Sequence, residues 1–119
     1  MDRQQIGKDA EKRAEKFLLT QRLTLLTRNF SCRFGEIDLI MQQGNTLIFV
    51  EVRYRNTDRY GGAAASVTPT KQRKIIRTAE LYLSQHKALC NKICRFDVLA
   101  FEYDAAPDKP LWYKDAFRL

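Results

Sequence analysis

The apolar residues of the chain recur with two different periods, and these periods predict its secondary structure. Helical spacing predicts one helix over residues 6–21 and a second from Pro69 to about His86, with Thr68 as the N-cap. Short segments rich in β-branched and aromatic residues predict five strands. These strands cover residues 23–34, 36–41, 46–54, 95–103 and 111–117.

The order of these elements predicts the fold class. A helix, three strands, a helix and two more strands describe an α/β domain in which a mixed sheet is flanked by helices. A chain of 119 residues has the usual size of one domain, and no internal repeat or linker divides it. We therefore expect a single domain over residues 1–119.

The composition excludes several classes of protein. No apolar run approaches the roughly 20 residues that span a bilayer, and the polar first residues are unlike a signal peptide. We therefore expect a cytoplasmic protein without a membrane partner. The odd number of cysteines argues against a disulfide framework. A zinc site would need Cys32, Cys90, Cys94 and His86 together, and reduced thiols that bind no metal are the simpler interpretation.

The net charge of +7 is concentrated in one segment. Residues 53–77 contain a single acid, Asp58. The basic residues of this segment are Arg53, Arg55, Arg59, Lys71, Arg73, Lys74 and Arg77. A polyanion is the natural partner of such a segment, and a nucleic-acid backbone is the commonest one in the cytoplasm. The alternative is a solvated basic face that only confers solubility.

The second and third predicted strands form a hairpin that brings acidic residues together. With a four-residue turn at 42–45, Glu36 faces Glu51 and Asp38 faces Phe49, so that the acids project from one face of the sheet. A shift of one residue in this register would send Asp38 to the other face, whereas a shift of two would keep the arrangement.

Two of these acids are expensive to bury where the sequence places them. Asp38 and Glu51 both lie between large apolar neighbours, and a buried carboxylate needs a partner or a cation. Two nearby carboxylates suit Mg²⁺ or Mn²⁺, which prefer hard oxygen ligands. Alternatively, Glu51 pairs with Arg53 or Arg55 on a solvated face. Spacing alone leaves both interpretations open.

Two short motifs resemble a known family. The segments GEIDLI at residues 35–40 and FVEVR at residues 49–53 resemble the signature of the YraN-like family of uncharacterised bacterial proteins. More widely they are similar to the PD-(D/E)xK nucleases, which include archaeal Holliday-junction resolvases. Weaker matches extend over nearly the whole chain. The resemblance implies a restriction-endonuclease-like core.

The resemblance also implies roles for individual residues. Asp38 and Glu51 would be metal ligands for Mg²⁺ or Mn²⁺, and Glu11 would be an auxiliary acid at the same metal. Gln72 would be a further polar residue of the site. Arg53 occupies the position of the motif lysine, and here the chain departs from the nuclease pattern. An arginine stays protonated and cannot accept a proton, although it can hold phosphate and stabilise charge.

Motifs and charge together lead to three functional hypotheses. The first is a metal-dependent DNA endonuclease, in which the basic segment tracks the phosphate backbone. The second is a nucleic-acid-binding module of the same fold without cleavage activity, for which Arg53 is the best argument. The third is an interaction protein that docks an acidic partner. Branched DNA as the substrate and a homodimer as the assembly are implied only by the likeness to resolvases.

Overall fold

The computed structural model describes residues 3–55, 67–102 and 110–118. Its helices and strands match the predicted ones closely, with shifts of a few residues at the ends. They are α1 (Arg3–Thr20), β1 (Thr24–Cys32), β2 (Gly35–Gln43), β3 (Thr46–Arg55), α2 (Pro69–Gln85), the short 3₁₀ turn η3 (Lys87–Leu89), β4 (Ile93–Glu102) and β5 (Leu111–Phe117). Thr68 caps α2 as predicted, because its hydroxyl accepts a hydrogen bond from the backbone N–H of Lys71.

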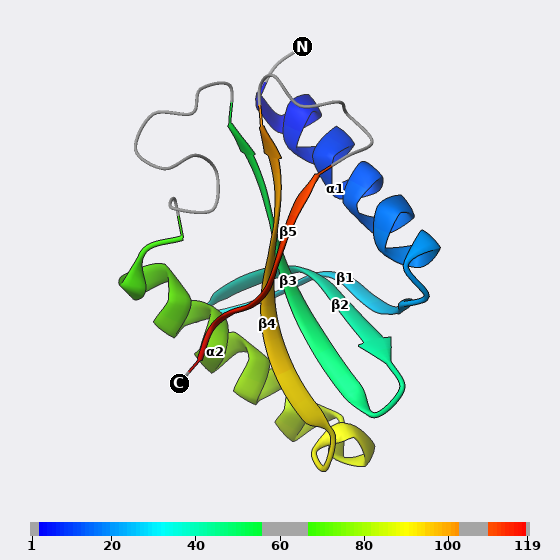
Figure 1. Ribbon diagram of the computed structural model, residues 1–119. Helices are drawn as coiled ribbons and strands as arrows, with labels where there is room; N and C mark the ends of the chain where they lie inside the picture. The colour runs from blue at the N-terminus through cyan, green and yellow to red at the C-terminus, as the bar shows by residue number, and fades with distance from the viewer. Residues whose placement is uncertain (1–2, 56–66, 103–109, 119) are drawn as a thin grey trace.

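The five strands form one mixed sheet in the order β1-β2-β3-β4-β5 (Figure 1). β1, β2 and β3 are antiparallel neighbours, β3 and β4 are parallel, and β4 and β5 are antiparallel. The parallel pair requires a crossover, which α2 provides. The predicted fold class, a mixed sheet flanked by helices, is therefore confirmed. No helix of the described residues is long and apolar enough to cross a membrane.

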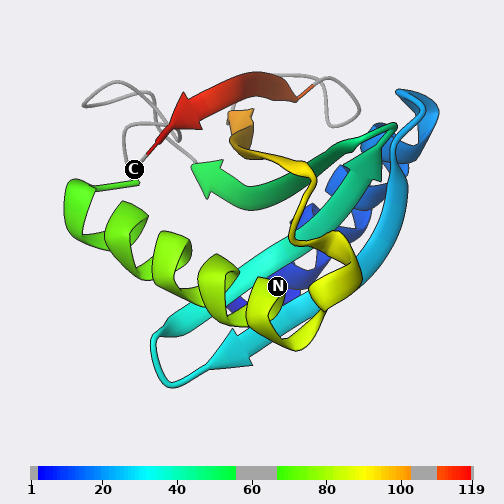
Figure 2. The ribbon, with the colours of Figure 1, turned by 90° about the horizontal axis from the view of Figure 1, so that it is seen from below.

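The helices cover opposite faces of the sheet, so the domain has three layers (Figure 2). α1 packs its apolar side, with Ala14 and Leu18, on a cluster that includes Ile48 and Val50 of β3. α2 packs on the other face, on a cluster that includes Phe49. β3 is therefore buried on both faces, and its side chains alternate between the two clusters. Any polar residue near the middle of β3 must find a partner inside the protein.

The predicted register of the β2–β3 hairpin is wrong by two residues. Gln43 pairs with Thr46, so the turn holds only two residues, and its first residue, Gly44, has a φ of +58°. A glycine at this position permits the tight two-residue turn. The pairing continues to Leu39 opposite Val50. The same register, continued by one residue, sets Asp38 against Glu51 rather than Phe49.

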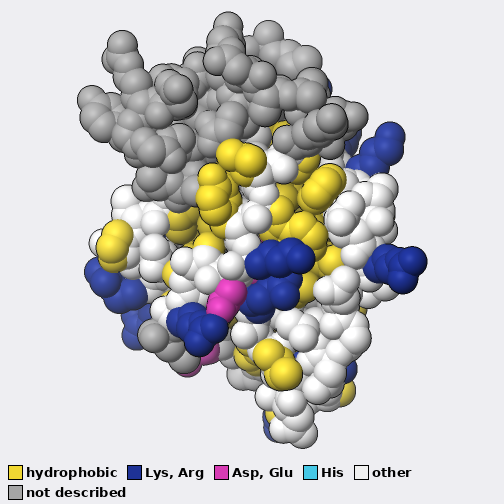
Figure 3. Space-filling view, in the orientation of Figure 1, with side chains coloured by type: hydrophobic (Ala, Val, Ile, Leu, Met, Phe, Trp, Pro, Cys, Tyr) yellow, Lys and Arg dark blue, Asp and Glu magenta, His cyan; other side chains and the backbone are white. Residues whose placement is uncertain are grey.

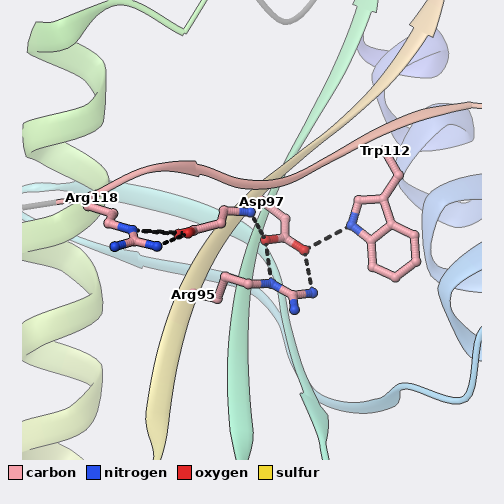
Figure 4. Close-up of polar contacts among 5 residues, drawn as sticks. Arg95, Asp97, Trp112 and Arg118 are labelled. Atoms are coloured by element: carbon pink, nitrogen blue, oxygen red, sulfur yellow. Dashed lines mark hydrogen bonds and ion pairs between the residues drawn. The ribbon is translucent and has the colours of Figure 1, made fainter.

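A buried carboxylate joins β5 to β4 (Figure 4). Asp97 is fully buried. It accepts hydrogen bonds from Arg95 Nε and Nη2 at 2.9 Å, from Trp112 Nε1 at 2.8 Å and from the backbone N–H of Asp115 at 2.9 Å. The regular pairing of β4 with β5 is interrupted between Phe96 and Val98. Asp97 therefore supplies acceptors where the backbone ladder does not, and the sequence pattern alone did not single it out.

We expect Asp97→Ala to lower the free energy of unfolding by about 3 kcal/mol, because it leaves several donors without their acceptor. Urea unfolding followed by tryptophan fluorescence measures the change. Asp115→Asn is the control. It removes only an exposed ion pair with Arg118 and keeps a residue that tolerates the positive φ of 55°. A loss as small for Asp97→Ala as for this control would contradict the assigned role.

Candidate metal and nucleic-acid site

The two acids of the motif meet where β2 and β3 separate. The backbone pairing of these strands ends at Leu39 and Val50. At the next position the carboxylate of Asp38 replaces the backbone, because its Oδ2 accepts a hydrogen bond of 2.8 Å from the N–H of Val52. Glu51 lies on the neighbouring strand, and the exposed fractions of Asp38 and Glu51 are 9% and 6%. The hairpin thus holds two carboxylates side by side in the interior.

Burial changes the ionisation of both acids. The pKa of Glu51 is raised from 4.5 to about 7, first by burial and then by the charge of Asp38, while Arg53 and Lys71 oppose the rise. Burial also raises the pKa of Asp38, against the hydrogen bond from Val52, which lowers it. Holding two buried carboxylates together therefore costs the folded protein free energy. Such costly arrangements are frequent at functional sites.

A third acid, Glu11, approaches the pair from helix α1. Glu11 of α1 is partly buried, and burial raises its pKa, with a further contribution from the charge of Asp38 and an opposing hydrogen bond from Asn29. The structure thus brings Glu11 next to Asp38, as the resemblance implied. However, the residues described contain no group of three His, Cys, Asp or Glu side chains that could hold a metal ion. The role of Glu11 as a third ligand stays a prediction.

Two basic residues face the acids from different elements. Lys71 Nζ lies 3.6 Å and Arg53 Nε lies 3.7 Å from Glu51 Oε1. Arg53 Nε is also buried, and it has no hydrogen-bond partner in the part of the chain that the structure describes. A buried N–H without an acceptor is costly, so this atom marks a place where a ligand oxygen would fit. The same residues can therefore form ion pairs with Glu51 or take part in a metal site, and the geometry is compatible with both interpretations.

Lys71 is the site residue whose role sequence reasoning missed. It was expected only to bind nucleic acid, yet its ammonium group reaches Glu51. The signal that could have found it is the capping motif: Thr68 fixes the first turn of α2, and its hydroxyl accepts from the N–H of Lys71. The cap fixes where α2 begins, and the packing of the apolar face of α2 on the sheet turns Lys71 toward β3.

Gln72 takes a different position from the one its predicted role suggests. Its amide donates a hydrogen bond of 3.1 Å to the carbonyl of Val67, at the segment that leads into α2. Its side chain lines two surface hollows between α2 and the β5 end of the sheet, together with residues such as Phe117 and Arg118. No contact joins Gln72 to Asp38 or Glu51 among the interactions of the described residues. Its place in the catalytic set stays a prediction.

The predicted nucleic-acid-binding residues divide into two groups. Arg73, Lys74 and Arg77 project from α2 and are exposed. The face shown in Figure 3 carries Lys and Arg side chains in several places and acidic ones in few. Arg59, the side chain of Arg55 and the glycine-rich segment 60–65 lie outside the described residues. The basic character of α2 is therefore the part of the predicted surface that can be located.

The donor set suits one class of metal ion. Mg²⁺ is commonly held by one or two carboxylates together with water and substrate phosphate, rather than by an all-protein cage. Asp38 and Glu51 supply such carboxylates, and Arg53 Nε, which has no hydrogen-bond partner among the described residues, lies 3.7 Å from Glu51 Oε1. The cysteines, by contrast, are free, and Cys90 and Cys94 are exposed. The residues present fit a hard divalent cation.

The raised pKa of Glu51 predicts a stability that depends on pH. The folded protein keeps a proton on Glu51 that the unfolded chain releases, so stability is full below about pH 4.5 and falls as the pH rises toward 7. Glu51→Gln removes this loss. In EDTA, we expect the variant to gain about 3 kcal/mol relative to the wild type between pH 4.5 and pH 8.

Glu15→Gln is the matched control for this measurement by urea unfolding. Hydrogen bonding to Arg28 lowers the pKa of Glu15, so the control should lose stability at high pH instead of gaining it. Parallel stability curves for Glu51→Gln and the wild type would show that Glu51 titrates as an ordinary exposed acid.

Comparison with known proteins identifies the family of the chain. Residues 10–101 match the uncharacterised protein family UPF0102. A UPF0102 protein of Aeromonas hydrophila is 52% identical over 112 residues, which cover 93% of this chain and 83% of that protein. A UPF0102 protein of Nitrosomonas europaea is 50% identical over 111 residues, covering 93% of this chain and 92% of that protein. The similar protein of Pseudomonas syringae is 47% identical over 116 residues, with 97% and 94% covered. The chain thus belongs to the UPF0102 family.

Proposed function

We propose that this protein is a metal-dependent enzyme that hydrolyses phosphodiester bonds in DNA. The observation that carries the proposal is the pair of buried carboxylates, Asp38 of β2 and Glu51 of β3, where these two strands separate. The pKa of Glu51 is raised to about 7, so the charged form that a cation needs is costly without one. A cation between the two acids would remove their repulsion, and the fold would then gain from the charges it buries.

Each residue of the site has a definable task in this reaction. Asp38 and Glu51 would hold Mg²⁺ or Mn²⁺, which supplies a water of lowered pKa and neutralises phosphate charge. The N–H of Val52 keeps Asp38 oriented. Arg53 offers its Nε, which has no hydrogen-bond acceptor among the described residues, to a phosphate oxygen. Lys71 brings a second positive charge that can stabilise the charge developing on the phosphate.

A specific observation favours a second candidate, a nucleic-acid-binding module that does not cleave. Arg53 stands at the position of the motif lysine, and Arg53 and Lys71 both pair with Glu51. Ion pairs of this kind can stabilise the acid in the absence of any metal. A third candidate, docking of an acidic protein, predicts binding to acidic polypeptide and no preference for nucleic acid.

Cleavage of DNA tests the lead proposal. With Mg²⁺ or Mn²⁺ we expect nicking of at least one substrate in a panel of linear, flapped and four-way DNA, the branched forms being included because of the likeness to resolvases. Asp38→Asn and Glu51→Gln should each reduce the rate by at least about 100-fold, since each removes a ligand of the reacting centre. Product formation on denaturing gels measures the rate.

Glu15→Gln serves as the control, because the carboxylate of Glu15 is paired with Arg28 and not with a basic residue of the site. Activity that survives both Asp38→Asn and Glu51→Gln would place the reaction elsewhere or in a contaminant.

The same preparations, passed through size-exclusion chromatography with light scattering, test the homodimer. Cytoplasmic location stays a prediction.

The substitution Arg53→Lys separates the enzyme from the non-cleaving module. A lysine can lose its proton and an arginine cannot, so the variant should cleave faster than the wild type, by about 10-fold or more. Arg28→Lys, on the exposed ion pair with Glu15, should leave the rate unchanged. DNA binding by the wild type and by Arg53→Lys, without cleavage by either, would establish the non-cleaving module.

A further inference from the structure

The turn between β1 and β2 carries an aromatic ring that two arginines share. Arg33 and Phe34 form this turn, and the guanidinium carbons of Arg33 and Arg77 lie over the Phe34 ring, 4.9 and 5.1 Å from its centroid. Phe34 is half-buried and both arginines are exposed. The two positive charges come from separate elements, the turn and α2, and converge on one side chain.

Neither arginine has an acidic partner in the described part of the chain. The ion pairs found there involve Arg28, Arg53, Lys71, Arg95 and Arg118, and neither Arg33 nor Arg77 is among them. Two like charges held close together repel each other, and a bound anion relieves this repulsion. Cation–π contact with the ring restricts both side chains without using their N–H groups. The N–H groups remain available to an anion.

The turn is fixed firmly against α2. A Cβ atom placed on Gly35 would lie 3.5 Å from Thr78 Oγ1 and 3.6 Å from Lys74 Cβ, so the backbone of the turn touches the helix. The thiol of Cys32 contacts Thr78 Oγ1 at 3.7 Å. Gly35 also has a φ of +153°, which a residue with a side chain rarely adopts. Phe34 is therefore held beside Arg77 rather than swinging freely.

The arginine pair lies at a defined spacing from the acids. Lys71, which contacts Glu51, and Arg77 are separated by six helical residues, or about 9 Å along α2. On β2, which α2 contacts, Gly35 and Asp38 are separated by three strand residues, or about 10 Å along the strand. One strand of B-form nucleic acid carries a phosphate about every 3.4 Å along its axis, so a phosphate at the arginine pair is a neighbour along the strand of the one at the acids rather than the same phosphate.

We propose that Arg33 and Arg77, positioned by Phe34, bind a backbone phosphate of a nucleic-acid strand a short way along that strand from the acidic pair. The inference rests on the proposed function and deepens it, because it gives the direction in which the strand leaves the site: along α2 toward the β1–β2 turn. Both guanidinium groups lie over the ring, which positions them and leaves their N–H groups available to the phosphate.

Equilibrium binding to DNA tests this proposal without any need for cleavage. The full-length protein is titrated in EDTA into a fluorescently labelled oligonucleotide duplex with a single-stranded tail, at several salt concentrations, and anisotropy gives Kd. We expect Arg33→Ala and Arg77→Ala each to raise Kd by about 10-fold and to reduce the salt slope by about 1. Lys87→Ala, which removes an exposed charge beyond the far end of α2, should raise Kd by less than about 2-fold.

The ring provides a test that charge alone cannot mimic. Phe34→Leu keeps the net charge and an apolar side chain but removes the cation–π surface, and we expect Kd to rise by about 3- to 5-fold. Phe34→Tyr keeps the ring and should bind as the wild type does. Thermal unfolding of each variant shows whether it is folded. If Phe34→Leu does not fold, Phe34→Tyr still shows whether a protein that keeps the ring binds as the wild type does.

The outcomes distinguish this proposal from the proposed function. If the wild type binds DNA and both arginine variants bind as Lys87→Ala does, the phosphate site is wrong and the proposed function stands. If Phe34→Leu binds as tightly as the wild type, the positioning role of the ring is wrong. If the wild type binds polyglutamate but not DNA, both proposals are overturned in favour of an acidic protein partner.

Discussion

The burial of two carboxylates at the point where β2 and β3 part is the constraint on which the rest of the site depends. A carboxylate loses much of its hydration in such a position, and a second one nearby adds repulsion. A hydrogen bond from the backbone N–H of Val52 stabilises Asp38, and ion pairs with Arg53 and Lys71 stabilise Glu51. The compensation is incomplete, since the pKa of Glu51 remains raised to about 7. A site balanced in this way is prepared for a further positive charge.

The topology explains why these groups come from so many parts of the chain. The hairpin supplies the acids, α1 covers one face of the sheet, and α2 covers the other as the crossover between the parallel strands β3 and β4. One helix therefore contributes packing on its inner side and basic residues on its outer side. Membership of the UPF0102 family gives this arrangement a place among similar proteins, and the chemistry of the site must be argued from its residues.

Much of the fold follows from local patterns, because helix periodicity, strand alternation and the cap of α2 are local properties. The register of the hairpin does not follow as directly, since it depends on the turn, and Gly44 allows a tighter turn than the predicted one. The error was two residues, so Asp38 and Glu51 remained neighbours. The sequence therefore places the two acids near each other, although their predicted alignment was wrong.

The remaining site residues depend on long-range packing that the sequence pattern does not express. Lys71 and Gln72 are adjacent in the chain, and only the packing of α2 on the sheet decides which of them reaches Glu51. The hydrogen bonds of Asp97 join positions on two strands whose pairing is irregular. A pattern of apolar spacing cannot reveal either arrangement, because both depend on polar side chains that meet across elements.

The N-cap of α2 has a consequence for how this family can vary. Thr68 and Pro69 define where the helix begins by contacts within residues 68–72, and the apolar residues of α2 that pack on the sheet decide its rotation about its axis. The number of residues that precede the cap does not enter into this decision. Insertions or deletions between β3 and Thr68 could therefore reshape that border of the molecule while the ammonium group of Lys71 keeps its orientation.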